Sequence, residues 1–459
     1  MLATTALQIA SATGGKLLGR EDISITEIST DSRTIQPGDL FVPLKGDNFD
    51  GHNYIDMALE KGAAAALCAR LPETIREDKT YLLVSDTKRA LRDLASWYRG
   101  QFNIPIVQIT GTMGKTTLKE MLATVLAQKY NTLKTPGNFN GDIGAPLTLL
   151  SLTSEHQAAV VETGMDAAGQ IRWLGEAVRP DIAIITNIGD VHIWNFDNSR
   201  EKVLQAKAEI FENLCPGGLA VLSGDDELLN TLHLEFETVR CGLAEGCSVQ
   251  VVDLQERGMD GVDCTVVTAR DRYPLSIPVP GAHMAGLASI CVAAAERLGL
   301  TKEEIARGIA AYTPADNRLR VERLPGGRIM INDSYNANPK SVQADLAILA
   351  LHTTGRRIAM LGDMTELGAF EEEGHRAVGE CVGRLGIDVL LAVGERSRKW
   401  IVPAAEEAGC PDVRWYESRD AVKDDLLALY GPGDALLVKA SHFICRFDLM
   451  TDFLRTYPF

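Results

Sequence analysis

The amino-acid sequence predicts an α/β protein whose main architecture is the doubly wound parallel sheet. Short apolar runs alternate with amphipathic helical patterns, as buried parallel strands and their covering helices do. One such strand, at residues 104–110, is joined to the next helix by a tight glycine loop. A second alternation of strands and helices begins near Pro314. The chain is therefore expected to hold more than one sheet.

Chain length predicts several domains. At 459 residues the chain exceeds one hydrophobic core, and ordinary domain sizes predict about three domains. We expect them at residues 1–96, 97–313 and 314–459, where the pattern of elements changes.

The expected elements can be given domain by domain. Those of the first domain are strands 39–44 and 80–85 and helices 54–62 and 88–102. Those of the second are strands 104–110, 158–162 and 181–188, a helix with the apolar stripe Leu118, Met121, Leu122, Val125 and Leu126, a helix over 200–214, and a β-rich appendage at 238–280. Those of the third are strands 357–364, 388–394, 412–416 and 434–441.

Composition and charge exclude several classes of protein. An apolar content of 46% is ordinary for a globular enzyme, and a net charge of -16 argues against a broad basic face for nucleic acid. The nine cysteines form no C-x-x-C pair, which suits reduced thiols in the cytosol. No apolar run reaches the roughly 20 residues that cross a bilayer, and the N-terminus has no basic signal-peptide region. We expect a cytoplasmic monomer that binds neither membrane nor nucleic acid.

The segment ITGTMGKTTLKE, residues 109–120, has the composition of a phosphate-binding loop. Gly111 and Gly114 allow a tight turn whose N–H groups face phosphate oxygens, at the N-terminus of a helix. Lys115 can reach the β- and γ-phosphates of ATP, and the hydroxyl of Thr116 can bind Mg²⁺. The alternative is an ordinary glycine turn with a solvated lysine. The expected nucleotide-binding residues are Gly111, Thr112, Met113, Gly114, Lys115, Thr116 and Thr117.

Three further residues are candidate metal ligands. Glu162 and His192 follow predicted strands, and the carboxyl ends of parallel strands meet at one edge of a sheet. Carboxylate and imidazole suit cations that bridge phosphates, although a histidine in a loop is as often structural. Lys207 lies on the apolar face of its predicted helix, where burial favours the neutral amine. That amine can form a carbamate with CO2 and so become an anionic ligand, or its stem can extend to water.

Taken together, these segments resemble the Mur ligase family. GTMGKTT, ITNIG with His192, and AKAE around Lys207 occur in the order of that family. NDSYNANPKS (332–341), LGDMTELG (361–368) and the N-terminal segment 31–52 extend the resemblance over nearly the whole chain. It implies the three-domain Mur ligase architecture: an N-terminal domain for the uridine nucleotide substrate, a central P-loop doubly wound sheet, and a C-terminal Rossmann-like domain.

The resemblance also implies an activity. It points to an ADP-forming ligase that uses ATP and Mg²⁺ to add D-alanyl-D-alanine to UDP-N-acetylmuramoyl-tripeptide through an acyl phosphate, in peptidoglycan synthesis. A ligase of the same fold with a different acid or amine is one alternative. A P-loop regulator without ligase chemistry is the other, and it leaves the motifs of the third domain without a purpose.

Site residues carried over by the resemblance fall into four groups. The catalytic group is Lys115, Lys207, His192, Asn138 and Arg318. The metal group is Thr116, Glu162, His192 and Lys207, with Lys207 matching the lysine that Mur ligases carbamylate. Arg318 and Asp333 join the loop residues in contacting ATP, Asp333 through the ribose. The substrate group is Ser32, Arg33, Asn48, Asp50, Asn140, Tyr335, Asn336 and Asn338.

Some positions depart from the family pattern or have a simpler interpretation. Gly141 stands where a second consecutive asparagine is common, Met284 where an asparagine beside adenine is usual, and KASH replaces KGS at Lys439. These departures concern the adenine contacts and the fine substrate geometry. NDSYNANP can also be an Asn-rich turn that caps the helix after it, and GDMTELG can be an ordinary strand-to-helix loop.

Overall fold

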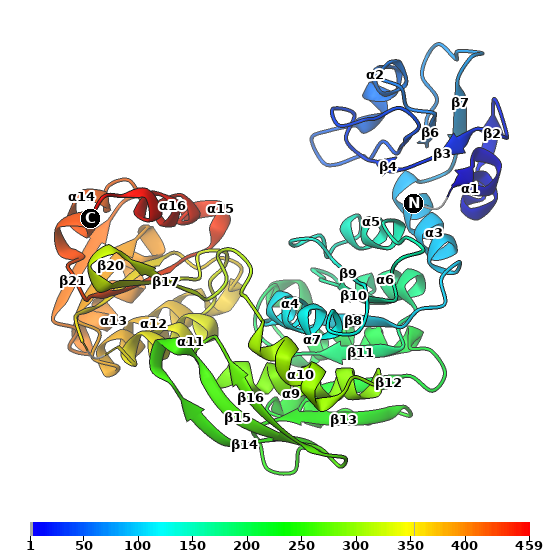
Figure 1. Cartoon of the computed structure of the whole chain (residues 1–459). Coiled ribbons are helices and arrows are strands. Elements are labelled where there is room, and N and C mark those ends of the chain that lie inside the picture. Colours follow the sequence, from blue (N-terminus) through cyan, green and yellow to red (C-terminus); the bar gives the residue numbers. More distant parts are fainter. Residues whose placement is uncertain (1–2, 353) are drawn as a thin grey trace. The chain divides into compact units, whose positions relative to one another are not determined.

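The structure, a computed structural model, describes residues 3–352 and 354–459 (Figure 1). The chain divides into two compact units. The first comprises Met1–Thr110, Tyr130–Ile184 and Lys207–Leu219; the second comprises Gly111–Lys129, Ile185–Ala206 and Ala220–Phe459. Within the described residues, no helix combines the length and the apolarity that a membrane crossing requires.

The N-terminal part of the first unit is built on a five-stranded sheet of order β2-β7-β6-β5-β4. Strands β4 to β7 pair in parallel and β2 pairs antiparallel to β7. The strands of this sheet are β2 (Lys16–Leu18), β4 (Ile28–Ser29), β5 (Leu40–Phe41), β6 (Ala65–Cys68) and β7 (Thr80–Leu83). A separate antiparallel pair is formed by β1 (Thr4–Thr5) and β3 (Ser24–Ile25). The helices are α1 (Ala6–Thr13), α2 (Ile55–Glu60) and α3 (Thr87–Arg99), with a 3-10 turn η1 (Gly51–Tyr54) before α2. The four elements expected here are present, each shorter than predicted.

The first unit also contributes strands to a nine-stranded sheet, where they run in the order β11-β8-β10-β9, with β10 parallel to β8 and to β9. They are β8 (Ile106–Thr110), β9 (Thr132–Lys134), β10 (Ala158–Glu162) and β11 (Ile182–Ile185), with helices α5 (Gly144–Leu150) and α6 (Gln170–Val178). All residues of β8, β10 and β11 are buried, as the apolar runs predicted. Strand β8 begins after Pro105, which has no N–H to give to a ladder.

The second unit begins with the phosphate loop and helix α4 (Lys115–Leu126). The predicted stripe Leu118, Met121, Leu122, Val125 and Leu126 is fully buried. The strands expected at 238–280 are present as β13 to β16, and with β12 they form one end of the nine-stranded sheet in the order β16-β15-β14-β13-β12. These are β12 (Leu219–Ser223), β13 (Glu237–Gly242), β14 (Val249–Glu256), β15 (Val262–Val267) and β16 (Arg272–Ile277), with helices α8 (Glu227–Asn230), α9 (Ala282–Arg297) and α10 (Lys302–Ala310).

One helix prediction was wrong in extent. The helix expected over 200–214 is α7 (Arg200–Ala208), and the chain then tightens into a 3-10 helix, η3 (Glu209–Asn213). Periodicity alone cannot separate the two, because the apolar side chains of 203, 210, 211 and 214 are buried in either form.

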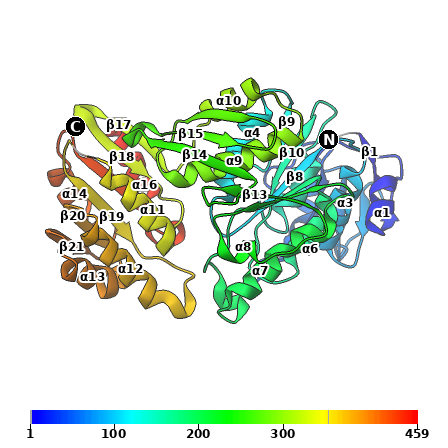
Figure 2. The ribbon, with the colours of Figure 1, turned by 90° about the horizontal axis from the view of Figure 1, so that it is seen from below.

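The C-terminal part of the second unit is a six-stranded sheet of order β17-β18-β22-β19-β20-β21, parallel except for the edge strand β17 (Figure 2). The strands are β17 (Arg320–Leu324), β18 (Arg328–Asn332), β19 (Arg357–Gly362), β20 (Val389–Val393), β21 (Asp412–Tyr416) and β22 (Ala435–Lys439). The helices are α11 (Pro339–Ala350), α12 (Glu371–Arg384), α13 (Val402–Glu407), α14 (Lys423–Leu429), α15 (His442–Cys445) and α16 (Asp448–Thr456).

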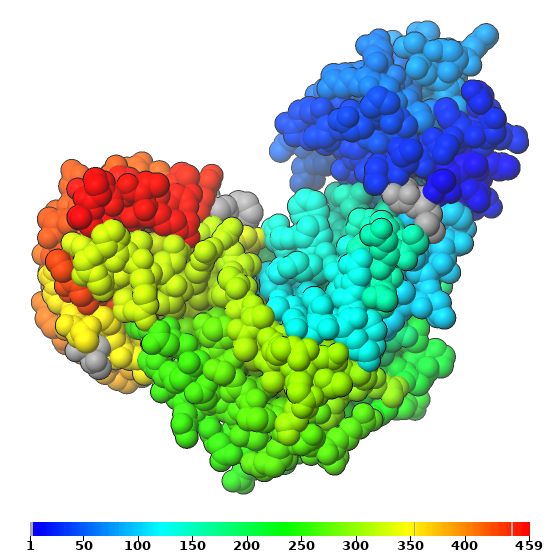
Figure 3. Space-filling model, in the orientation of Figure 1, coloured from blue at the N-terminus to red at the C-terminus, as the bar shows by residue number. Residues whose placement is uncertain are grey.

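Helices cover both faces of this sheet, as in a doubly wound fold. One core joins alternate strand residues to α11, α12 and α13, and a second core joins the others to α14 and α16. Helix α16, red in Figure 3, lies on the surface, and Arg455 ties it to β17 by paired bonds of 2.7 and 2.6 Å to Glu322. The edge strand is thereby fixed from the helix beside it.

Candidate active site

The phosphate loop lies between β8 and α4, as the sequence predicted. Gly111 has φ 145° and Gly114 has φ 75°, and both values favour glycine. The ammonium of Lys115 donates to the carbonyl oxygens of Gly111 at 2.9 Å and Thr112 at 3.3 Å. The lysine thus lies back over the loop, where an ATP phosphate group would meet it.

The loop is held by the segment 186–189, which follows β11. Met113 N–H donates to the side-chain oxygen of Asn187 at 2.9 Å, and Thr112 N–H to the main-chain oxygen of the same residue at 3.0 Å. The hydroxyl of Thr186 donates to Met113 O at 2.6 Å, and Gly189 N–H to the hydroxyl of Thr112 at 2.8 Å. Two loop N–H groups are therefore used internally. The first turn of α4, which follows the loop directly, is where N–H groups can face an anion.

The contact with Thr186 explains why residue 111 is a glycine. A Cβ at Gly111 would lie 1.9 Å from the hydroxyl oxygen of Thr186. The residues 186 and 187 were not named from the sequence, although ITNIG was recognised as a segment. Their role depends on a strand-to-strand approach that no local pattern reveals.

Glu162 and Asn140 are brought together in the first unit. Glu162 ends β10 with no exposed surface, and its Oε1 accepts from the Asn140 amide at 2.7 Å. Its N–H donates to the hydroxyl of Thr135 at 2.9 Å. Asn138 contributes its carbonyl oxygen to Asn140 N–H at 2.7 Å. The loop of residues 138–142 is thus hydrogen-bonded, through Asn140, to the carboxylate of Glu162, which is a predicted metal ligand.

The other two metal candidates have distinct surroundings. His192 has a left-handed backbone (φ 59°), and its Nδ1 lies 3.7 Å from Glu366 Oε2, a neighbour that the sequence did not indicate. Lys207 is 5% exposed, so the predicted burial is confirmed. No group of three or more His, Cys, Asp or Glu side chains suited to a metal is preassembled within residues 3–352 and 354–459. Oxygen donors such as Glu162 and Thr116 fit Mg²⁺, which takes one or two protein ligands plus phosphate and water.

Asp333 lies in a buried charged group of the C-terminal sheet. It bonds to the ammonium of Lys439, which is 2.9 Å from Asp345 Oδ2. Burial acts to raise the pKa of Asp333, yet Lys439 beside it lowers that pKa on balance. Burial raises the pKa of Asp345 well above its usual range, and the two carboxylates raise the pKa of Lys439 against the effect of burial. Asp345 was not found from the sequence, because α11 and β22 are far apart along the chain.

Arg318 and Tyr335, predicted for different substrates, are in contact. The Arg318 guanidinium lies 3.8 Å from the centre of the Tyr335 ring. The guanidinium of Arg318 lies against the face of the Tyr335 ring, so a change at Tyr335 is expected to alter the orientation of Arg318.

Asn336 and Asn338, two of the three asparagines of NDSYNANP, form hydrogen bonds within the local turn. The side-chain oxygen of Asn338 accepts from Ser341 N–H at 3.0 Å and caps α11, which has Pro339 at its first position. The side-chain oxygen of Asn336 accepts from Ala337 N–H at 2.9 Å. The capping interpretation is therefore right for Asn338. Its substrate contact stays a prediction.

The predicted uridine-nucleotide residues occupy one end of the five-stranded sheet. Arg33 forms a fork with Asp31 at 2.9 and 2.7 Å and, through the hydrogen bond, lowers the pKa of Asp31 to about 2. Asp50 accepts from His52 N–H at 3.0 Å, which lowers its pKa. Ser32 is buried, and its carbonyl accepts from Lys61 at 3.1 Å, whereas Asn48 is exposed.

Two family departures have a structural account. A Cβ at Gly141 meets nothing within 4 Å, so the position has room for the more common asparagine. Met284 is 1% exposed in α9, where it is part of the core.

The glycine loop at the N-terminus of a helix, parallel sheets, and a buried carboxylate at a strand end define a nucleotide-binding α/β enzyme. Models of the Mur ligase middle domain, the glutamate ligase domain and the Mur ligase catalytic domain match residues 109–295, 317–442 and 24–99. The chain belongs to the Mur ligase family.

Relatives within the family share most of the chain. The UDP-N-acetylmuramoyl-tripeptide--D-alanyl-D-alanine ligase of Escherichia coli is 36% identical over 86% of this chain and 87% of its own. That of Bacillus subtilis is 32% identical over 99% of both. The crystal structure of MurF from Acinetobacter baumannii has a TM-score of 0.89 at 30% identity, covering 98% of this chain and 99% of that one. MurF of Thermotoga maritima in complex with ADP has a TM-score of 0.82 at 27% identity, covering 94% and 97%.

Proposed function

We propose that this chain is an ADP-forming ligase that adds D-alanyl-D-alanine to UDP-N-acetylmuramoyl-tripeptide in peptidoglycan synthesis. The observation that carries the proposal is the match to ligases of that name, at 36% identity over 86% of this chain and at 32% identity over 99% of it. The phosphate loop supplies the site for ATP. A structural neighbour bound to ADP supports the use of that nucleotide.

The reaction must first activate a carboxylate, which is a poor electrophile. A carboxylate oxygen of the tripeptide attacks the γ-phosphorus of ATP, the bond to ADP breaks, and an acyl phosphate forms. The amine of D-alanyl-D-alanine then attacks the acyl carbon, loses a proton, and inorganic phosphate leaves. Lys115 and the first turn of α4 stabilise charge on the transferred phosphoryl group.

Mg²⁺ would be held by Thr116, Glu162, His192 and Lys207, the last as a carbamate. When bound, the ion neutralises charge on the phosphates. Asn140 orients Glu162 through the bond of 2.7 Å. The burial of Lys207 supports the carbamate, because a neutral amine is the form that reacts with CO2.

The remaining assignments extend the same proposal. Domains at 1–96, 97–313 and 314–459 would bind the uridine nucleotide, ATP and the dipeptide. Ser32, Arg33, Asn48 and Asp50 would contact the uridine nucleotide, and Asn138 the acyl region. Arg318 and Asp333 would contact ATP, with Tyr335, Asn336 and Asn338 beside the dipeptide. We propose a cytoplasmic monomer whose partners are these small molecules.

The carbamate has its own test. Lys207→Ala is expected to lose at least about hundredfold in kcat, with part of the loss restored by a short carboxylic acid. Carbon NMR after exposure to labelled CO2 should give a carbamate signal in the parent that the variant lacks. Lys202→Ala is the matched control, because Lys202 lies on the same helix with a side chain that is 52% exposed. Full activity of Lys207→Ala would remove the carbamate from the scheme.

Substrate identity is tested with a panel of acids and amines. The proposal predicts that the tripeptide nucleotide and D-alanyl-D-alanine give the highest kcat/KM. A different preferred pair would favour the alternative, a ligase of this family acting on another acid or amine. Gly141→Asn restores the residue that is common in the family, and the position has room for its side chain. The same panel measured on this variant shows whether Gly141 affects the choice of substrate.

A further inference from the structure

Arg318 lies between two residues with left-handed backbones. Asn317 has φ 60° and Leu319 has φ 44°. This conformation costs roughly 1–2 kcal/mol for most L-residues, and asparagine tolerates it better than leucine. Such strain persists only where the surroundings impose it. Two sets of contacts do so here.

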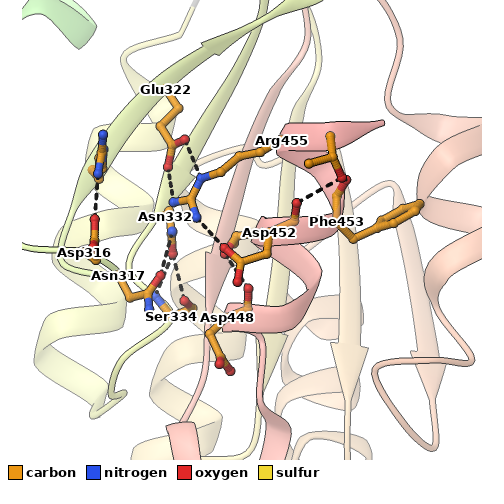
Figure 4. Close-up of polar contacts among 12 residues, drawn as sticks. Asp316, Asn317, Glu322, Asn332, Ser334, Asp448, Asp452, Phe453 and Arg455 are labelled. Atoms are coloured by element: carbon orange, nitrogen blue, oxygen red, sulfur yellow. Dashed lines mark hydrogen bonds and ion pairs between the residues drawn. The ribbon is translucent and has the colours of Figure 1, made fainter. Parts of the chain in front are cut away.

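Asn317 is held by the end of β18 (Figure 4). The amide of Asn332 donates to the side-chain oxygen of Asn317 at 3.0 Å, and Tyr335 N–H donates to its carbonyl at 3.1 Å. Asn332 has no exposed surface, and its own oxygen accepts from the hydroxyl of Ser334 at 2.8 Å. Its orientation is therefore fixed.

Leu319 is held by the buried charged group. Its N–H donates to Asp333 Oδ1 at 3.0 Å. The other oxygen of Asp333 bonds to Lys439, which also pairs with Asp345. The side chains of Lys439 and Asp345 are 1% and 5% exposed. Because Lys439 is itself buried and also pairs with Asp345, it fixes the plane of the Asp333 carboxylate.

We propose that Asn332, Lys439 and Asp345 are positioning residues for Arg318, because they hold residues 317 and 319 so that the guanidinium lies on the Tyr335 ring. The inference rests on the proposed contact between Arg318 and the nucleotide. Buried ion pairs are a poor source of stability, and apolar replacements often stabilise a protein. Stability therefore does not explain the ion pairs of Lys439, whereas the orientation of Arg318 does.

A double-mutant cycle tests the proposal. Asn332→Ala and Asp345→Asn are each expected to raise the KM for ATP and the Kd for ADP about tenfold, as the loss of one charge-assisted contact does. In an Arg318→Ala background the same changes should have little further effect, because the residue they position is gone. Equal effects in both backgrounds would overturn the proposal.

A matched control lies at the other end of the same strand. Asp434 precedes β22 and pairs with Arg356 at 2.8 Å, whereas Lys439 ends that strand. Arg356→Met is expected to lower Tm while the KM for ATP stays unchanged. A rise in KM equal to that of Asp345→Asn would show a general effect of lost ion pairs and contradict positioning.

Leu319→Gly decides the matter if Asn332→Ala does not fold. Glycine relieves the strain but also removes a side chain that packs against the core of the C-terminal sheet, so Tm is not the deciding readout. The deciding readout is the KM for ATP, which should rise because Arg318 loses its fixed orientation. An unchanged KM would overturn the proposal. If Arg318→Ala itself leaves ADP binding unchanged, the proposed nucleotide contact fails instead, and the two failures are thereby distinguished.

Discussion

The phosphate loop and the Arg318 segment are both short and both have unusual backbone angles, but they are held in different ways. Glycines at 111 and 114 accept their angles without strain, and uncharged groups of 186–189 hold the loop. Asn317 and Leu319 are strained, and buried side chains, three of them charged, hold them. In the first region the residue type alone permits the backbone angles, and distant residues only hold the loop in place. In the second region the residue types do not favour the angles, and the side chains that impose them include Lys439, far along the chain.

The largest effect should come from breaking the first region. Gly111→Ala would place Cβ 1.9 Å from the Thr186 hydroxyl at a φ of 145°. We expect ATP binding to weaken at least about hundredfold, because clash and backbone strain together cost about 3 kcal/mol. ADP titration by calorimetry measures this. Gly141→Ala is the folding control, since a Cβ there meets nothing within 4 Å. Unchanged ADP affinity in Gly111→Ala would contradict the account of the loop.

A smaller change sharpens the comparison without a clash. Thr186→Val removes the hydroxyl that donates to Met113 O at 2.6 Å, but the Asn187 amide still donates there at 3.1 Å. The Kd for ADP should rise by about tenfold or less, which is the range for one neutral hydrogen bond. Thr148→Val makes the same chemical change in α5 and should leave ADP binding unaltered. A hundredfold rise in the Kd for ADP would mean that the Asn187 amide cannot replace the Thr186 hydroxyl as the donor to Met113 O.

A prediction on stability, which leaves nucleotide binding aside, concerns pH and the C-terminal region. His375 in α12 is buried, with Nε2 accepting from Met364 N–H at 3.1 Å, and burial lowers its pKa to about 4. Below its ordinary pKa the unfolded chain binds a proton that the folded protein does not. Stability should therefore fall as pH decreases from about 6.5 towards the folded value, by at most about 1.4 kcal/mol per pH unit.

Denaturant unfolding at several pH values measures that slope. His375→Gln removes the titrating group, so the slope of the free energy of unfolding against pH should decrease by the contribution of about one proton. Equal slopes in the parent and the variant would show that His375 is protonated in the folded state.

The sequence predicted what local pattern determines. The glycine loop, the buried strands and the apolar stripe of α4 follow from spacing and periodicity over a few residues. The phosphate-loop and metal assignments came from the glycine loop, the strand ends and the apolar face of the helix at Lys207, and family resemblance added Arg318 and Asp333; all of them stay predictions. Thr186, Asn187, Glu366 and Asp345 were missed because tertiary contacts give them their roles. The 3-10 end of α7 was missed because burial looks alike in both helix types.

Product formation tests the central claim most directly. With ATP, the tripeptide nucleotide and D-alanyl-D-alanine present, we expect one ADP, one phosphate and one amide per turnover, with the pentapeptide nucleotide identified by mass spectrometry. Omission of either the tripeptide or the dipeptide should abolish the amide. ATP hydrolysis at the same rate without both co-substrates, and no amide product with them, would contradict the assignment.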